Sequence, residues 1–381
     1  MPFLTTNLAA SVFEEIKALV EKGLYASPEQ FLEIAAFNQL ALERGAKPAD
    51  LPVRSHQPQR GNHEEAPSAP APSAQHRRHR QSSRRRAAKG RTESVSESSA
   101  SATLKKFGLD LLRQLRVEPV PTEPRPPDER LWGQVNRLFP IKLACRWIAV
   151  ASAEAGFWLT YDPISDGLAR DAASLGSILS ASDATAERKR DELLATGLPR
   201  KANLASHDRF LSQYIARTTR AGDIYPGAIC QYALAVFHGD QLGLTKAGLD
   251  LARLENPVLD LEPHSAIASL SGGFPATLSD EERSFLIDQV ISFVPGELHD
   301  LTIVLEAIVA DHATPDDLLA SVRPHLPHEW SRMMTRTHVS GVVARLAEMG
   351  LIRRKWEGRN ARYEATPLGA RLVKEEARVD R

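Results

Sequence analysis

Residues 327–371 read PHEWSRMMTRTHVSGVVARLAEMGLIRRKWEGRNARYEATPLGAR. In the first part of this stretch the apolar residues recur at three- and four-residue spacing, which predicts an amphipathic helix from about Ser331. The buried side of that helix is expected to carry Val339, Val342, Val343, Leu346 and Met349. Gly350 is placed to end the helix, because a glycine readily adopts the left-handed conformation found after a helix C-terminus.

A β-hairpin is expected directly after this helix. Residues 351–356 are apolar and basic, residues 361–366 follow as a second short run, and Glu357-Gly358-Arg359-Asn360 between them is typical of a turn. Pro367 suits the first turn of a further helix, where its missing N–H is not needed. Helix, hairpin with a basic tip, and helix is the order of a winged helix-turn-helix.

Positive charge is concentrated in the same region. From Glu329 to Lys374 there are ten Lys/Arg and four Asp/Glu, a net charge of +6, whereas residues 297–328 hold six acids and one Arg. A basic helix and hairpin of this kind suit phosphate, and the alternative is a core helix with a solvated charged face. The residues that we expect to contact DNA here are Arg332, Thr335 and Arg336 on the helix, and Arg353, Arg354, Arg359 and Arg362 on the hairpin.

The motif VSGVVARLAEMGLIRR followed by GRNARYEATPLGARL resembles the MarR-like winged-helix family. The resemblance covers roughly the last hundred residues. It implies a helix that reads base edges, a wing that contacts phosphate or the minor groove, and a dimer. The chain departs from the family at Gly358, where the family usually has Asp before the arginine of its wing.

Residues 1–45 are expected to form a small unit of one strand and two helices. Residues 3–8 alternate, a helix is expected from Ser11 to Gly23, and Ser27-Pro28-Glu29-Gln30 is a capping box before a second helix. This order resembles the ribbon-helix-helix family of the CopG/Arc type. The resemblance implies a homodimer whose paired strands enter the major groove, with Thr5 and Asn7 facing the bases.

Charge weakens the DNA-binding interpretation of this first unit. Residues 1–45 contain six Glu against Lys17, Lys22 and Arg44, a net charge of −3, and the expected strand carries no Lys or Arg. A helical dimerisation hairpin would explain that balance equally well. Burying a core requires a second copy in either case, since so short a unit has little interior.

Residues 46–126 are expected to be a disordered linker, rich in Pro, Ala and Ser. Within it residues 76–91 hold eight Lys/Arg and no acid, which predicts either a non-specific arm for phosphate or a solvated spacer. Residues 104–117 show helical spacing of apolar residues and are a candidate docking helix for a protein partner.

Residues 127–262 are expected to form a second, divergent winged-helix-like domain. Its LTKAGLDL motif from residue 244 repeats the pattern of TPLGARL near the C-terminus, in each case after an expected hairpin. The tip of this first hairpin is not basic, so packing, dimerisation or a protein contact is an alternative to DNA contact. A linker at 263–278 then leads to the DNA-binding domain at 279–381.

Several chemistries have no support in the sequence. There is no phosphate-cradling glycine motif, Cys145 and Cys230 lack metal-ligand spacing, and Pro327 interrupts the pair His325 and His328. No run approaches 18 apolar residues, and no basic region precedes an apolar core at the N-terminus. We therefore expect no cofactor, no metal, no membrane span and no enzymatic activity, and a cytoplasmic, nucleoid-associated protein.

The sequence thus predicts a mainly α fold with small β-hairpins: a ribbon-helix-helix-like unit, a long basic linker and two winged-helix-like domains. The function expected is that of a dimeric prokaryotic transcriptional regulator that binds double-stranded DNA at specific sequences. A DNA-binding partition or replication adaptor of a mobile element is a close variant. A non-enzymatic scaffold or accessory subunit of a multi-protein, defence-type complex is the alternative from another class.

Overall fold

The computed structural model describes residues 13–14, 16–18, 28, 107–114, 116, 118–131, 133–189, 192–199, 204–219, 222–261, 267, 270, 277–357 and 360–379. The chain divides into two compact units, Met1–Ser94 and Val95–Arg381. In the first unit residues 13–14 and 16–18 are helical, as expected for a helix from near Ser11. The expected strand with Thr5 and Asn7, and the basic run at 76–91, lie outside the described residues.

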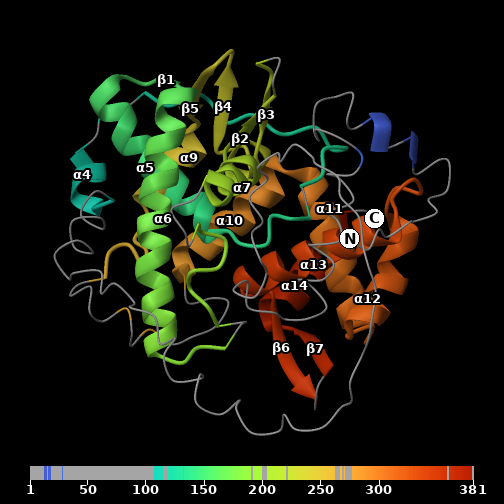
Figure 1. The fold of residues 1–381 in the computed structure, drawn as a ribbon. Helices are drawn as coiled ribbons and strands as arrows, with labels where there is room; N and C mark the ends of the chain where they lie inside the picture. Colours follow the sequence, from blue (N-terminus) through green and yellow to red (C-terminus); the bar gives the residue numbers. More distant parts are fainter. Residues whose placement is uncertain are drawn as a thin grey trace, which may run out of the picture. The chain divides into compact units, whose positions relative to one another are not determined.

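The second unit is mostly helical with small antiparallel sheets (Figure 1). Its first half, residues 107–261, contains one three-stranded sheet in the order β1-β5-β4 and one separate two-stranded sheet, β2-β3. The elements of this half are α4 (Leu109–Gln114), α5 (Phe139–Ala155), β1 (Leu159–Thr160), α6 (Tyr161–Thr185), α7 (Leu204–Tyr214), β2 (Ala216–Thr218), β3 (Ile224–Pro226), α8 (Ala228–Gln231), β4 (Ala235–His238), β5 (Gln241–Leu244) and α9 (Lys246–Arg253).

The second half, residues 277–379, contains helices and one hairpin, and in Figure 1 that hairpin projects away from the helices of its own unit. The hairpin pairs Ile352 with Ala365 at its base and Glu357 with Asn360 at its tip. The elements are α10 (Asp280–Phe293), α11 (Pro295–Val309), α12 (Pro315–Val322), the 3-10 helix η4 (Arg323–His325), α13 (Arg332–Glu348), β6 (Ile352–Glu357), β7 (Asn360–Ala365) and α14 (Pro367–Val379).

Local sequence signals explain where these helices begin and end. Ser279 and Glu282 form the expected capping box at the start of α10. Thr314 caps α12 ahead of Pro315, and the side chain of Ser331 accepts a hydrogen bond from the N–H of Met334 at the start of α13. Gly350 has a φ of 74°, so it follows α13 in the left-handed conformation expected of a glycine there.

The expected linker at 46–126 extends too far. Residues 107–126 belong to the second unit: Phe107 and Leu112 are fully buried, and the N–H of Val120 donates to the carbonyl of Leu244 at 3.1 Å. The apolar spacing that marked 104–117 as a docking helix therefore corresponds to α4, which contacts α5 and α9 of its own chain. Phe107 and Leu112 are buried against the rest of the unit, so residues 107–126 are not part of a disordered linker.

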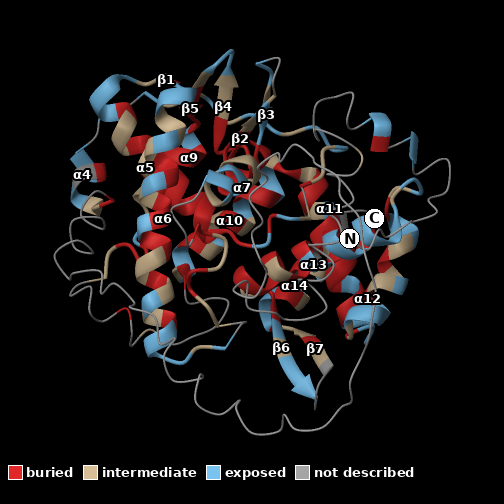
Figure 2. Ribbon diagram, in the orientation of Figure 1, coloured by how far each residue is buried: buried red, intermediate tan, exposed pale blue. Residues whose placement is uncertain are grey.

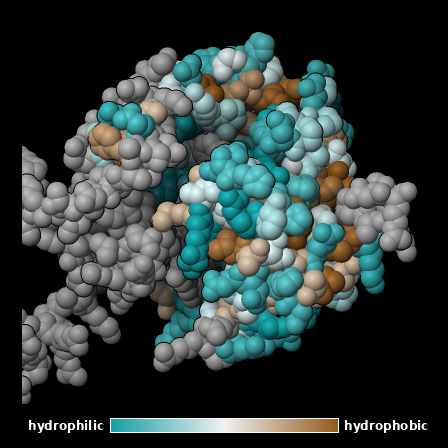
Figure 3. Space-filling model, turned by 90° about the vertical axis from the view of Figure 1, so that its right-hand side faces the viewer, coloured by the Kyte–Doolittle hydropathy of each residue, from teal (hydrophilic) through white to brown (hydrophobic). Residues whose placement is uncertain are grey.

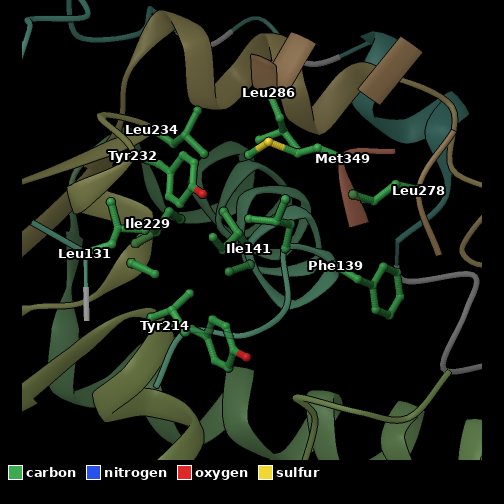
Figure 4. Close-up of a cluster of buried hydrophobic side chains, with 14 of the residues drawn as sticks. Leu131, Phe139, Ile141, Tyr214, Ile229, Tyr232, Leu234, Leu278, Leu286 and Met349 are labelled. Atoms are coloured by element: carbon green, nitrogen blue, oxygen red, sulfur yellow. The ribbon is translucent and has the colours of Figure 1, made fainter. Parts of the chain in front are cut away.

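The two halves of the second unit share one hydrophobic core. Figure 4 shows Ile141 of α5, Ile229 of α8, Leu286 of α10 and Met349 after α13 in a single buried cluster. Figure 2 shows burial concentrated where the halves meet, while the outer part of β6 is exposed. The segments 127–262 and 279–381, expected as separate domains, thus belong to one compact unit.

A buried ion pair and a buried hydrogen bond join the two halves as well. The Nζ of Lys142 on α5 lies 2.8 Å from the Oε1 of Glu282 on α10, and both side chains are fully buried. The guanidinium of Arg345 on α13 donates to both carboxylate oxygens of Glu297 on α11, at 2.6 and 2.8 Å, and to the carbonyl of Val135 at 2.5 Å. Buried charges of this kind require a partner, so these pairs fix the helices relative to one another. No helix among the described residues is long and apolar enough to span a bilayer.

Candidate nucleic-acid interface

One side of the first two turns of α13 is exposed, whereas most of the rest of the helix is buried. Arg332, Met333, Met334, Arg336, Thr337 and Ser340 are exposed, and Met333 and Met334 keep 64% and 52% of their surface. The expected apolar stripe from Val339 to Met349 lies in the core. Helix α13 therefore has a buried C-terminal part and a free N-terminal part that carries two arginines.

Thr335 does not lie on this exposed surface, and the expectation that it would is wrong. Its side chain is fully buried, and its Oγ1 donates to the carbonyl of Ser331 at 3.1 Å. Position 335 is four residues before Val339, so it extends the apolar stripe by one turn toward the N-terminus. Arg332 and Arg336 lie on the other side of the helix from this stripe and are exposed.

Arg336 lies next to the hairpin. It lines a hollow of about 200 Å³ between α12, α13 and β7, together with Ser340 of α13 and Tyr363 of β7. Tyr363 is buried, and its backbone N–H donates to the carbonyl of Ala313 at 2.9 Å, which fixes β7 against the loop between α11 and α12. The exposed arginine of the helix and the hairpin thus form one continuous surface.

The hairpin has an aromatic face and a charged face. On the aromatic face the guanidinium of Arg354 lies 5.8 Å from the ring centre of Trp356 and 5.5 Å from that of Tyr363. Trp356 is 57% exposed. This stack holds Arg354 and an exposed indole together, which is an arrangement suited to a sugar, a base or an aromatic partner.

The charged face carries Arg353, Lys355 and Arg362, but two of these cations already have acidic partners. Lys355 is 2.6 Å from Glu364, and Arg362 pairs with Asp311 and, at 3.8 Å, with Glu357. A phosphate would therefore compete with carboxylates at Lys355 and Arg362. Arg359, at the expected tip, lies outside the described residues.

Arg353 is exposed but does not join the surface of α13 and Arg336. It lines a separate hollow at the base of the hairpin with Arg283 of α10 and Arg371 of α14. Of the seven residues expected to contact DNA in this half, the structure places Arg332 and Arg336 on the exposed turns of α13, and Arg354 and Arg362 on opposite faces of the adjacent hairpin.

Three exposed apolar residues of this surface were not among the expected site residues: Met333, Met334 and Trp356. The sequence did contain a signal for them. Met333 and Met334 lie outside the apolar stripe of α13, and Trp356 follows basic residues on the hairpin, so all three could have been predicted to be exposed. In Figure 3, viewed from the side on which α12 lies in Figure 1, the coloured atoms show small hydrophobic areas scattered among hydrophilic ones.

Behind α13 lies a buried polar cluster. The Nε2 of His338 is 2.9 Å from the Oδ2 of Asp300, whose other oxygen accepts from Arg130. Burial, together with the nearby positive charge of Arg345, lowers the pKa of His338 to about 4, so the imidazole is neutral at pH 7. Although burial opposes it, the carboxylate of Glu297 raises the pKa of Arg345, which therefore stays charged. His338, Asp300, Glu297 and Arg345 are buried, whereas Arg130 is partly exposed.

The β4–β5 hairpin of the first half does not reproduce this surface. The helix before it, α8, has only four residues, and all of them are buried. The hairpin itself ends at His238, Gly239 and Asp240 without a cation. The exposed helix needed to enter a groove is therefore missing at this position.

The described residues contain no group of three or more His, Cys, Asp or Glu side chains that could hold a metal. Burial raises the pKa of the thiols of Cys145 and Cys230 to about 12, so neither thiol is ionised at neutral pH. Comparisons of the chain with family models, with curated proteins and with solved structures gave no match. The candidate interface therefore rests on its own geometry.

Proposed function

We propose that the second half of the larger unit binds double-stranded DNA as a winged helix, with α13 in the major groove. The observation that carries this proposal is the exposure of the first two turns of α13, with Arg332 and Arg336, beside a hairpin that bears Arg354 and Trp356. A recognition helix contacts base edges through its N-terminal residues, and its remaining turns hold it to the rest of the domain.

The connections around the hairpin support the winged-helix arrangement. The chain runs α11, α12, α13 and then β6–β7, and Ala313, between α11 and α12, accepts a backbone hydrogen bond from Tyr363 of β7. That bond places the first loop at the edge of the hairpin, where a winged helix has its short third strand. The hairpin is thereby anchored beside α13, and its far end is free to reach the DNA backbone.

Each exposed side chain has a chemistry that suits this role. Arg332 and Arg336 are four residues apart and share one side of α13, and an arginine can donate two hydrogen bonds to guanine or bind a phosphate. Met333 and Met334 offer apolar contact to a thymine methyl group. Arg354, held against Trp356, suits the edge of the minor groove.

The direct test is binding of the full chain to random-sequence duplexes, with selection of the bound fraction and fluorescence anisotropy on the enriched sequences. Enrichment of a defined motif, with affinity that falls as salt rises, supports the proposal. Equal, weak binding to all duplexes at moderate salt would indicate an electrostatic contact with phosphate alone. That result would contradict the proposal that α13 contacts base edges.

We infer that the whole chain is a dimeric transcriptional regulator and that residues 1–45 are its dimerisation segment. A partition or replication adaptor would use the same surfaces. The inference rests on the resemblance of 1–45 to ribbon-helix-helix units. Removal of residues 1–45 is expected to convert a dimer into a monomer in sedimentation equilibrium. A dimer of unchanged stability would assign dimerisation to another segment.

A scaffold or accessory subunit is the second candidate, and one observation favours it. Met333, Met334 and Trp356 expose large apolar side chains on the same surface as the arginines, and such residues are typical of protein contacts. Both candidates predict that this surface binds a macromolecule. They differ in whether purified duplex DNA alone is sufficient.

A further inference from the structure

A second basic hollow lies at the base of the hairpin, at the end of α13 remote from Arg332. Three arginines from three different elements line it: Arg283 from α10, Arg353 from β6 and Arg371 from α14. Its volume is about 350 Å³, within the range of small-molecule sites. Helix α13 has 17 residues and is therefore about 25 Å long, so the hollow is remote from the exposed turns proposed to enter DNA.

Arg283 is held in place by its own helix. Its Nη2 lies 2.8 Å from the Oδ1 of Asp280, and its Nε donates to the carbonyl of Ser279 at 3.3 Å. The guanidinium also lies against Gly350, since a Cβ added to that glycine would be 3.5 Å from Nη1. The positive charge of Arg283 is explained by the nearby C-terminus of α13, because the free carbonyl groups there favour a cation.

Arg353 and Arg371 are not explained in that way. Both are exposed, and neither makes a hydrogen bond or an ion pair with another residue that the structure describes. Glu364 faces Arg353 across the hairpin, but its carboxylate is 2.6 Å from the Nζ of Lys355. Three guanidinium groups around one hollow repel one another, and Asp280, 96% exposed, offsets only the first of them.

We propose that this hollow binds a phosphate group. A guanidinium offers two parallel N–H groups that match two oxygens of a phosphate, and three of them from separate elements can enclose it. The phosphate belongs either to the DNA backbone or to a small phosphorylated molecule, since the chemistry of recognition is the same. The proposal does not depend on DNA binding by α13, because Arg332 and Arg336 are not part of the hollow.

The test uses the full chain and pyrophosphate as the probe, titrated by calorimetry in a phosphate-free buffer. Saturable binding is expected, and Arg371→Ala and Arg353→Ala are each expected to weaken it on the order of tenfold or more. Arg170→Ala is the matched control, because Arg170 is an exposed arginine on α6 remote in sequence from the hollow. Circular dichroism confirms that each variant is folded.

Anisotropy with duplex DNA separates the two sources of phosphate. If Arg371→Ala weakens pyrophosphate binding and leaves DNA affinity unchanged, the hollow takes a free phosphorylated molecule. If it weakens both, the hollow contacts the DNA backbone. Absence of saturable pyrophosphate binding to the unaltered chain, or equal binding by the Arg371→Ala and Arg170→Ala chains, overturns the proposal. Loss of DNA binding by Arg336→Ala alone bears only on the function proposed for α13.

Discussion

The carboxylate of Glu348, in the last turn of α13, accepts a hydrogen bond from the backbone N–H of Leu138 at 2.6 Å, immediately before α5. It also accepts from the N–H of Phe139 at 3.3 Å and from the Oγ1 of Thr277 at 3.0 Å. A side chain of the proposed reading helix thus caps a helix of the other half of the unit. Burial raises the pKa of this carboxyl group, although the nearby Arg137 and these hydrogen bonds oppose the shift. The position of α13 is therefore fixed by the whole unit.

The first prediction concerns this cap. Glu348→Ala removes the acceptor of three buried donors, so the free energy of unfolding should fall by on the order of 3 kcal/mol. Glu348→Gln keeps one acceptor oxygen and should lose about 1 kcal/mol. Urea unfolding followed by circular dichroism measures both. Equal stability of the alanine variant and the unaltered chain would contradict the role of this carboxylate.

The second prediction separates the exposed side of α13 from its buried side. Arg336→Ala should leave the fold intact and lower the affinity for a selected duplex about tenfold, since a base contact contributes about 1–3 kcal/mol. Thr335→Val, one position away but buried, should leave the affinity unchanged and alter only stability. Anisotropy titrations on the two variants provide the measurement. Comparable loss of affinity in both would mean that Arg336 acts through the fold and not through DNA.

Local signals in the sequence predicted the second half of the unit closely. The hairpin, expected at 351–356 and 361–366, occupies Ile352–Glu357 and Asn360–Ala365, and the capping box at Ser279 and the end of α13 at Gly350 are confirmed. These features depend on residues near one another in the chain: caps, a turn and an apolar stripe. That locality is why they could be predicted without the tertiary structure.

Features that depend on residues far apart could not be predicted. Residues 228–237 are strand-like in composition but contain α8 and then β4, because the buried setting of Ala228–Gln231 outweighs that composition. Thr335 was predicted to contact DNA because it is polar, although its position continues the apolar stripe of α13 by one turn. The hollow that joins Arg283, Arg353 and Arg371 brings together residues from three elements, and no local pattern marks it.

The third prediction concerns Trp356 on the hairpin. Its indole is 57% exposed and stacked near Arg354, so Trp356→Ala should cost little stability. DNA affinity should fall about three- to tenfold, because one aromatic contact typically contributes about 1 kcal/mol. Trp356→Phe is the matched control and should retain most of the affinity. Unchanged binding of DNA by the alanine variant, together with lost association with a protein partner, would favour the scaffold.

The fourth prediction concerns His338 and the stability of the unit at low pH. Burial, with the positive charges of Arg345 and Arg130, lowers the pKa of His338 from 6.5 to about 4, although Glu297 opposes the shift. Arg130 also engages the carboxylate of Asp300, whose Oδ2 lies 2.9 Å from the Nε2 of His338. The edge of the ring meets Trp330, with 4.9 Å between the ring centres, which helps to exclude water.

A lowered pKa means that the unfolded chain binds the proton more readily than the folded one. The stabilising effect of a neutral His338 is therefore complete above pH 6.5 and is lost as pH falls toward 4. Between pH 7 and pH 5 the free energy of unfolding should decrease by about 2 kcal/mol from this group. His338→Gln should remove that part of the pH dependence, whereas His312→Gln, at an exposed position, should keep it. Urea unfolding of the three chains at both pH values gives the comparison. An identical pH-dependent loss in the His338→Gln chain would show that other groups control acid stability.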